Sequence, residues 1–320
     1  MIASEPLTVC LLVLPGSSLL TVASALDPLR ATNRFTNGQS FRWQVQSLNG
    51  DPVPLSCGFD LPVNGPFQPT RERDVLALIA GFNAMDHDTP QVRRQLQAAW
   101  PVQHTVLALE AASWLLAQAD LVRSEPITTH WEDLEDFETA YPALDVRTDR
   151  YTIGRKLCSA GGASPTFDML LDLIQRWRGY PLAMQVAGAF IYDQARAASE
   201  TQSHASHERL EQFDSRVARA IRAMEQSIDQ PISVAALARR VGMSSRGLEY
   251  AFARSIGQTP GAYYLNIRLQ RAARLAQDTG LPFQEIAIRC GFGSQSAFAR
   301  AFKQKFGRSP SNLRQPFGRT

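Results

Sequence analysis

The hydrophobic positions in the first two thirds of the chain change repeatedly between a spacing typical of strands and a spacing typical of helices. Strands are predicted for the short apolar or alternating runs at 7–14, 41–48, 74–82 and 102–110. Helices are predicted where apolar residues recur every three or four positions, at 19–34, 90–99, 111–119 and 131–140. The runs at 74–82 and 102–110 are apolar enough for the central strands of a parallel sheet.

The pattern continues in the same way towards residue 195. Residues 144–149 and 151–158 are predicted to form a pair of strands, and residues 159–177 a turn of small residues followed by a long helix. Strands that alternate with helices are typical of an α/β layer sandwich with a mostly parallel sheet. This is the fold predicted for residues 1–195.

The pattern changes after this region. Residues 196–208 (RAASETQSHASHE) are polar, rich in serine and without an apolar period, which predicts a linker. The sequence beyond has helical spacing as far as about Leu313. We therefore divide the chain into an α/β domain at 1–195, a linker at 196–210 and an all-helical domain at 211–320.

One recognition pattern occurs twice in the helical domain, at 237–260 and at 286–310. Each copy has a short apolar-periodic helix, a glycine-centred turn (Gly242, Gly291), a serine-started helix and a final Gly-x-x-Pro stop. This order predicts a helix-turn-helix, which presents its second helix to the DNA major groove. The two units are expected at about 234–256 and 284–306, so one chain would read two adjacent stretches of groove.

The apolar spacing of each second helix predicts which side chains face outward. Leu248 and Phe252 are expected inward in the first unit, and Phe298, Phe302 and Phe306 in the second. The residues predicted to contact DNA are Ser244, Ser245, Arg246, Glu249, Tyr250, Arg254, Ser294, Gln295, Ser296, Arg300 and Lys303. Such side chains bond base edges or phosphates. The alternative is an ordinary solvated helix face.

Charge divides the chain in the same place. Residues 211–320 hold 17 Lys and Arg against 7 Asp and Glu, a net charge of +10, whereas the other 210 residues hold 16 basic and 23 acidic groups, a net charge of −7. This asymmetry is expected when only one domain meets phosphate. Nearly all the basic residues are arginine, whose planar fork suits phosphate and guanine, although a compositional bias of the genome explains this equally well.

The sequence also argues against several classes of protein. The apolar run from Val9 has neither the basic start nor the cleavage site of a signal peptide, and no stretch approaches the roughly 20 apolar residues that span a bilayer. The four cysteines, Cys10, Cys57, Cys158 and Cys290, have no paired spacing, so we expect no metal site, disulfide or cofactor. A reduced, cytoplasmic setting is expected.

Residues 211–317 resemble the DNA-binding domain of the AraC/XylS family of bacterial transcription factors. The family's connecting-helix signature is matched by Pro260, Tyr264, Arg268, Leu269, Ala272 and Leu275. Its closing signature is matched by Cys290, Gly291, Phe292, Ser296, Phe298, Arg300, Phe302, Lys303, Phe306, Gly307, Pro310 and Arg314. The resemblance implies two helix-turn-helix units joined by a long helix at about 261–276, which holds the recognition helices ~34 Å apart. Arg314 is then expected to contact phosphate or to have a structural role.

The α/β domain resembles the ThiJ/PfpI superfamily, whose sheet is similar to that of class I glutamine amidotransferases. The matching stretches are 14–34, 107–121, 127–131 and 158–174. Enzymes of this superfamily place a nucleophilic cysteine on a sharp turn after the central strand, where the thiolate is stabilised. Here that place is taken by Glu110, Ala111 and Ala112. His130 matches the superfamily's histidine, but without a nucleophile it makes no dyad, so we expect no catalytic residue.

Regulators that combine these two domains form the GlxA-like subgroup, which resembles sensors of arginine, carnitine or glycine betaine. The resemblance implies a small-molecule effector at the carboxyl ends of the parallel strands. The candidate pocket residues are Thr21, Glu110, Ala111, His130 and Trp131. The alternatives are a Glu110 carboxylate bonded within its own turn and a Trp131 that belongs to the core. His104, inside an apolar strand, is interpreted as a buried histidine.

We therefore predict a transcription regulator that binds promoter DNA and a small effector, and the resemblance implies a homodimer and allows contact with RNA polymerase. Two alternatives remain. One is an amidotransferase-like enzyme with a DNA-binding tail. The other is a DNA-binding protein whose first domain is vestigial and binds no ligand.

Overall fold

The chain divides into two units, Met1–Ser203 and His204–Thr320. The computed structural model describes residues 5–36, 40–192, 197–199, 202, 215–278 and 281–313. Most of the predicted linker and Arg314 therefore lie outside the described residues. Each unit has its own hydrophobic cores.

A six-stranded sheet forms the centre of the N-terminal unit, in the order β2-β1-β5-β6-β8-β7. Five strands are parallel: β1 (Leu7–Val13), β2 (Phe41–Gln46), β5 (Arg73–Ala80), β6 (Gln103–Glu110) and β8 (Leu157–Ala160). The edge strand β7 (Tyr151–Ile153) runs antiparallel to β8. The prediction of an α/β layer sandwich with a mostly parallel sheet is confirmed.

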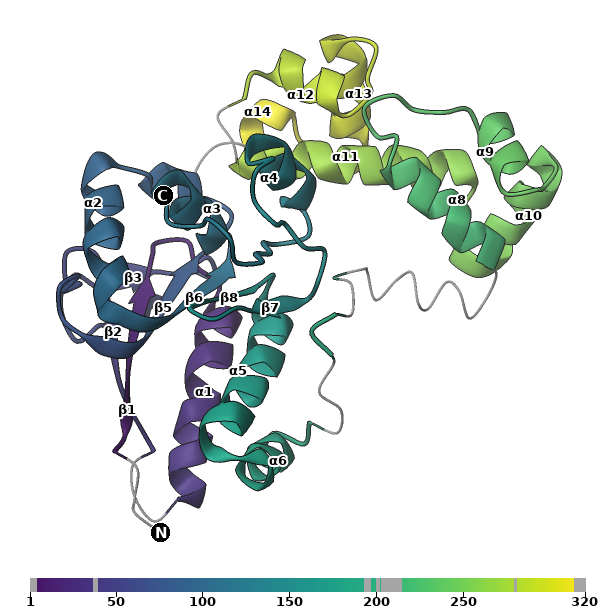
Figure 1. Ribbon diagram of the computed structural model, residues 1–320. Helices are drawn as coiled ribbons and strands as arrows, with labels where there is room; N and C mark the ends of the chain where they lie inside the picture. The colour runs from purple at the N-terminus through teal and green to yellow at the C-terminus, as the bar shows by residue number, and fades with distance from the viewer. Residues whose placement is uncertain are drawn as a thin grey trace. The chain divides into compact units, whose positions relative to one another are not determined.

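Helices cover both faces of this sheet (Figure 1). One face carries α1 (Leu19–Phe35), α5 (Ala163–Arg178) and α6 (Tyr180–Ala189), and the other carries α2 (Pro90–Ala99), α3 (Ala112–Gln118) and α4 (Leu134–Ala140). Successive strand residues point to opposite faces, so Leu11 packs with the first group of helices and Leu12 with the second. Both faces are thus buried, which explains the continuous apolar run of β1.

Smaller elements depart from the sequence prediction. The structure adds a hairpin of β3 (Val53–Pro54) and β4 (Asp60–Leu61), the 3-10 helices η1 (Ala84–His87) and η2 (Trp100–Val102), and the helix α6. The predicted strand pair of 144–149 with 151–158 is wrong, because 144–149 makes only an isolated bridge at Val146. Residues 151–160 instead fold back on themselves as β7 and β8, with the Gly154 N–H donating to the Leu157 carbonyl at 2.9 Å.

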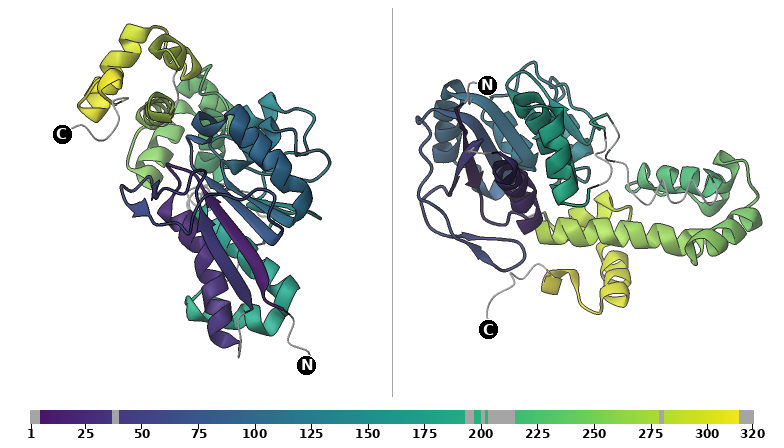
Figure 2. Two further views of the ribbon diagram at one scale, coloured as in Figure 1. Left: turned by 90° about the vertical axis from the view of Figure 1, so that its left-hand side faces the viewer. Right: turned by 90° about the horizontal axis from the view of Figure 1, so that it is seen from below.

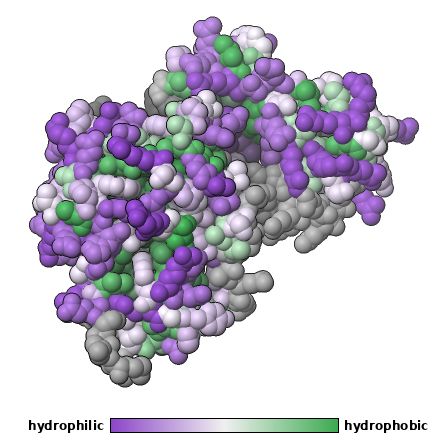
Figure 3. Space-filling view, in the orientation of Figure 1, coloured by the Kyte–Doolittle hydropathy of each residue, from purple (hydrophilic) through white to green (hydrophobic). Residues whose placement is uncertain are grey.

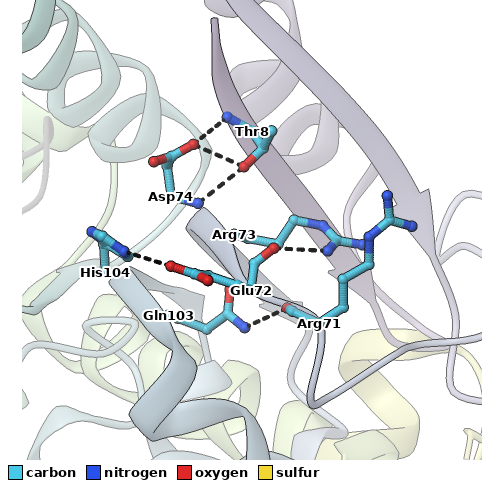
Figure 4. A network of polar contacts seen from close by, with 7 residues as sticks. All are labelled: Thr8, Arg71, Glu72, Arg73, Asp74, Gln103 and His104. Carbon is cyan, nitrogen blue, oxygen red and sulfur yellow. Dashed lines mark hydrogen bonds and ion pairs between the residues drawn. The ribbon is translucent and has the colours of Figure 1, made fainter. Parts of the chain in front are cut away.

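A polar network joins the amino-terminal ends of β1, β5 and β6 (Figure 4). The Asp74 carboxylate accepts bonds from the Thr8 N–H and hydroxyl at 2.7 and 2.8 Å. His104 lies 3.3 Å from Glu72, and its side chain is 65% exposed. The interpretation of His104 as a buried histidine is therefore wrong, because His104 is exposed on the face of β6 opposite to that of its buried neighbour Gln103.

The C-terminal unit consists of helices gathered about one long helix, α11 (Pro260–Asp278), as Figures 1 and 2 show. Around one end pack α8 (Ser215–Glu225), α9 (Val234–Arg240) and α10 (Ser245–Ile256), and around the other end pack α12 (Phe283–Arg289), α13 (Gln295–Phe306) and α14 (Pro310–Leu313). Each group encloses a separate apolar core. The all-helical prediction for this region is confirmed.

Hydrophilic side chains cover much of the face seen in Figure 3, with apolar side chains in smaller groups between them. Among the described helices, none has the length and apolar character that crossing a bilayer requires.

Candidate nucleic-acid interface and effector pocket

The turns after α9 and α12 have the same backbone geometry. Gly242 has a φ of 74° and Gly291 a φ of 69°, the left-handed conformation that favours glycine. The next residue in each turn, Met243 or Phe292, donates its N–H at 2.8 Å to the carbonyl five positions earlier. This pattern is a Schellman motif, which ends the first helix and redirects the chain. The repeat seen in the sequence thus corresponds to a repeat in backbone structure.

The two second helices, α10 and α13, also begin and end alike. The hydroxyl oxygen of Ser244 accepts the Gly247 N–H at 3.1 Å, and that of Ser294 accepts the Ala297 N–H at 3.2 Å. Left-handed glycines close both helices at their C-caps. Ser244 and Ser294 therefore cap their helices, and this leaves their hydroxyl hydrogens able to donate to a phosphate oxygen.

The outward faces of α10 and α13 are open to solvent. Leu248, Phe252, Phe298 and Phe302 are fully buried, whereas Tyr250 is 70% exposed. The predicted contacts that the structure places on exposed positions are Ser244, Ser245, Arg246, Glu249, Tyr250, Arg254, Ser294, Gln295, Ser296, Arg300 and Lys303. Of the predicted set, only Arg314 lies outside the described residues.

Arg268 of α11 fixes the second turn to the long helix. Its guanidinium donates to the Cys290 carbonyl at 2.8 Å and to the Gly291 carbonyl at 2.6 Å, and it lies 4.4 Å from the centre of the Phe292 ring. Burial lowers the pKa of Arg268, although arginine stays charged at neutral pH. The planar fork thus holds two carbonyls that the end of α12 leaves free.

The loop after α8 packs against the same place. The Tyr264 hydroxyl donates to the Ser227 carbonyl at 2.7 Å, and Gly291 lies so close to the Ile228 carbonyl that an added Cβ would be 2.4 Å from it. Tyr264 lies one helical turn from Arg268 on α11. Both helix-turn-helix units are therefore fastened to α11 at neighbouring points, which fixes one relative to the other.

In the N-terminal unit, the predicted effector pocket is centred on Glu110 at the end of β6. Glu110 has a φ of 58° and is half-buried, and its carboxylate accepts a hydrogen bond from the Thr21 hydroxyl. Burial raises the pKa of the Glu110 carboxyl, and the bond from Thr21 opposes this shift in part. Thr21 itself is fully buried, and the Ala111 N–H donates to the Ala80 carbonyl at 3.0 Å. The structure thus brings together Thr21 and Glu110, two of the predicted pocket residues.

The other two predicted residues lie on the loop that follows Thr129. The His130 ring packs edge-on against Phe82 at 4.7 Å and lies 5.7 Å from the Trp131 ring. Trp131 is 38% exposed, so its interpretation as a core residue is wrong. The Thr129 hydroxyl donates to the Glu110 carbonyl at 3.1 Å, which joins this loop to the end of β6.

Comparison with known proteins identifies the family. Residues 237–316 match the family described as a helix-turn-helix domain. The chain is 33% identical over 304 residues to the HTH-type transcriptional regulator CdhR of Pseudomonas aeruginosa, an alignment that covers 95% of this chain and 90% of CdhR. The chain belongs to the AraC/XylS family of transcription regulators. It is also 26% identical over 308 residues to the regulator GlxA of Rhizobium meliloti, covering 96% of this chain and 95% of GlxA, which places it in the GlxA-like subgroup.

The N-terminal unit of this AraC/XylS regulator has the fold of another group of proteins. A solved ThiJ/PfpI family protein from Pseudomonas syringae matches with a TM-score of 0.52 and 17% identity, covering 60% of this chain and 77% of that one. At this identity the likeness shows the fold alone.

Two residues that contact the predicted pocket residues were not predicted from the sequence: Phe82, which packs on His130, and Thr129, which bonds Glu110. Phe82 is the last residue of the predicted strand at 74–82, so the rule that ligands bind at the carboxyl ends of parallel strands could have found it. Thr129 had no such signal, because its role depends on a bond to a residue 19 positions away.

A cavity of about 390 Å³ lies at the other ends of the strands, away from Glu110. Its lining includes Trp100, Arg155 and Lys156, near the amino-terminal ends of β6 and β8. Ligands of parallel α/β sheets bind at the carboxyl ends, where Glu110 lies, so we place the candidate effector site there.

Proposed function

We propose that this AraC/XylS regulator reads two successive segments of major groove with α10 and α13, and that a small metabolite with a cationic group, bound in the Glu110 pocket, alters this binding. Arginine, carnitine and glycine betaine are the candidate metabolites. Two observations together carry the proposal. The outward faces of α10 and α13 are open to solvent, and a half-buried carboxylate, Glu110, stands where the superfamily's enzymes have their nucleophile.

The length of α11 supports the DNA part of the proposal. Its 19 residues span about 28 Å at 1.5 Å per residue, close to the ~34 Å of one turn of B-DNA. Because Arg268 and Tyr264 fasten the two units to this helix, α10 and α13 keep one separation. A fixed separation of this size suits two major-groove segments on one side of a duplex.

The chemistry around Glu110 supports a cationic ligand. A carboxylate in a half-buried place pairs with an ammonium or guanidinium group more strongly than an exposed one. The rings of Phe82 and Trp131 are both partly exposed beside His130, and aromatic faces attract quaternary ammonium groups. A ligand with a positive charge and apolar methyl groups would satisfy both kinds of contact.

The two buried thiols of the sheet, Cys10 and Cys158, support a binding role over catalysis. Burial raises the pKa of both Cys10 and Cys158 to about 12, so both remain protonated at neutral pH. A protonated thiol is a poor nucleophile. Glu110 stands in the strained position where related enzymes place their cysteine, and a carboxylate there cannot perform thiolate chemistry.

We further propose that the N-terminal unit forms a homodimer, and α6 is a candidate interface because it exposes Tyr180 (60%) and Met184 (49%). Sedimentation of the wild type and of a Met184→Glu variant tests this, and equal masses for the two would contradict it. A contact with RNA polymerase is proposed from the family resemblance alone.

The main experiment is a thermal-shift screen of the full chain with arginine, carnitine and glycine betaine, followed by footprinting on the gene's own upstream region. A ligand that binds the folded protein raises the melting temperature by mass action. We expect one of these metabolites to do so in the wild type and to fail in Glu110→Gln, which keeps the shape of the side chain and removes its charge. No shift across a broad panel of cations would instead favour a vestigial first domain.

A further inference from the structure

Gln202, near the end of the N-terminal unit, is held by that unit through its side chain and its backbone. Its side-chain amide nitrogen lies 2.7 Å from the Thr128 hydroxyl, 2.7 Å from the Thr129 carbonyl and 2.9 Å from the Asp149 carbonyl. Its backbone N–H donates to the Thr148 carbonyl at 3.0 Å. Three oxygens thus lie within hydrogen-bond distance of one glutamine amide nitrogen, so its two N–H donors are both satisfied.

The place that Gln202 fills depends on the absence of a side chain at Gly161. A Cβ added to Gly161 would lie 2.1 Å from the Gln202 amide oxygen and 2.3 Å from its nitrogen, closer than atoms can approach. The third of the three nearest atoms is the Gln202 amide carbon, at 2.3 Å. A methyl group at residue 161 would therefore expel the Gln202 side chain and leave its three partners in place.

A second bond holds the same stretch of chain. The Arg150 N–H donates to the Ala198 carbonyl at 3.1 Å. The Arg150 guanidinium is bonded in turn to Asp168 at 2.7 Å, within the helix layer of the N-terminal unit. The Arg150 amide therefore reports whether Ala198 lies against the unit.

The groups that hold Gln202 adjoin the residues of the proposed effector site. Thr129 bonds the carbonyl of Glu110, and the next residue is His130. Thr128 is fixed on its other side, because its carbonyl accepts the Ser113 hydroxyl at 2.6 Å and its N–H donates to the Ser159 hydroxyl at 2.8 Å. A ligand that moves the 128–130 loop would change the oxygens that Gln202 contacts.

We propose that Gln202 is a latch that couples occupancy of the Glu110 pocket to the connection with the DNA-binding unit. Gln202 stands thirteen positions before Ser215, the first residue of α8. A ligand that prefers one state of the latch shifts its population, and the state of the latch decides where the connection leaves the N-terminal unit. The ligand-dependent part rests on the effector site proposed above.

The test compares Gln202→Ala and Gly161→Ala in the full-length protein, with Gln91→Ala on the exposed first turn of α2 as the matched control. In both latch variants, hydrogen exchange at the Arg150 amide should be about tenfold faster, the effect of losing roughly one hydrogen bond. Their affinity for the upstream DNA should change at least threefold, in the same direction. The double variant should match Gln202→Ala, because both changes remove the same contact.

The ligand arm uses glycine betaine. If the wild type responds to it, the ratio of DNA affinities with and without glycine betaine should fall towards one in both variants. A wild type that does not bind it contradicts that choice of effector, and the exchange and DNA-affinity comparison still tests the latch. Variants with wild-type exchange at Arg150, or with unchanged DNA affinity, would overturn the latch.

Discussion

Glu110 combines a left-handed backbone, a half-buried carboxyl and a hydrogen bond from a buried threonine. The left-handed region is uncommon for any residue but glycine, and at functional sites such strain is held by the surrounding structure. Burial raises the carboxyl pKa, which means that the folded protein binds a proton at Glu110 more readily than the unfolded chain does. The same residue is thus costly to ionise and well placed to receive a cation.

Replacing Glu110 with Gln should stabilise the N-terminal unit at pH 7. A raised folded-state pKa gives stability that is fully present below the ordinary carboxyl pKa of about 4.5 and is lost as the pH rises through the folded value. The variant escapes this loss, so its melting temperature should exceed that of the wild type at pH 7 and approach it near pH 4. Thermal unfolding measured across this range checks the sign, and the exposed Glu138→Gln is the control. A difference in melting temperature between the two proteins that grows as the pH falls would contradict a raised pKa for Glu110.

Arg300 is the residue at which we expect base recognition to be clearest. Arg300→Ala should lower affinity for the upstream site by roughly 5- to 150-fold, as expected for loss of about 1–3 kcal/mol of base discrimination, and should change affinity for random DNA far less. Mobility-shift titrations on both DNAs measure the two effects. Arg289→Ala is the matched control, since Arg289 on α12 pairs with Glu285 at 2.8 Å. An equal loss on both DNAs would show that Arg300 only neutralises phosphate.

The two helix-turn-helix elements have the same turn in different surroundings. Gly242 has open space where a Cβ would stand, whereas Gly291 is packed against the Ile228 carbonyl and the Pro231 ring. The first turn therefore needs glycine only for its backbone angle. The second also needs glycine because the α8–α9 loop lies against it, and this contact joins the two units.

Gly242→Ala and Gly291→Ala separate these two requirements. Both place alanine in the left-handed region, which costs roughly 1–2 kcal/mol. Gly291→Ala must also displace the backbone of the α8–α9 loop, so we expect it to lower the free energy of unfolding of the C-terminal unit by about 2 kcal/mol more, in the range of overpacked positions. Chemical denaturation of the full-length variants measures the difference. If the two variants lose the same free energy of unfolding, the α8–α9 loop can move away from residue 291 without destabilising the unit.

For the molecule as a whole, the two regions of the chain differ in the sign of their net charge. The region from 211 to 320 has a net charge of +10 and the rest a net charge of −7, so DNA is attracted to one part of the chain and repelled by the other. The attraction is a long-range property of the summed charges. It governs affinity for any duplex, whereas the outward side chains of α10 and α13 govern the choice of sequence.

Salt dependence measures this division. Each phosphate neutralised by the protein contributes about −0.9 to the slope of log affinity against log salt concentration. We expect Lys303→Gln to make the slope shallower by about 1 and to weaken specific and random DNA alike. Binding titrations between about 50 and 200 mM salt give the slope. An unchanged slope would place Lys303 away from the phosphates.

Much of the fold could be predicted because its signals are local. The central strands, α2 and both recognition helices were found within a few residues of their ends, since apolar spacing and serine caps act over one or two turns. Two elements were predicted wrongly: a strand was expected at 144–149, and the helix α6 was not expected. An edge strand and a half-exposed helix have weak patterns, and their pairing partners decide their structure.

The candidate sites could be predicted only in part. The outward residues of α10 and α13 followed from helical spacing alone. The pocket residues followed from resemblance, and the contacts of Thr129, Phe82 and Gln202 were not foreseen. The bond between Thr21 and Glu110 joins residues 89 positions apart, and the Gln202 to Thr128 bond spans 74 positions. Spacing along the chain has no information about such pairs.

The sequence by itself determined the repeated glycine turns, their capped reading helices and the basic charge around them, because these depend on backbone preference and composition over short stretches. The tertiary structure alone decided three contacts. Arg268 bonds α11 to the second turn, the half-buried Glu110 accepts a hydrogen bond from Thr21, and the Gln202 side chain packs against Gly161. These features arise where distant segments pack, and packing selects contacts by shape and by the demand that buried polar groups find partners.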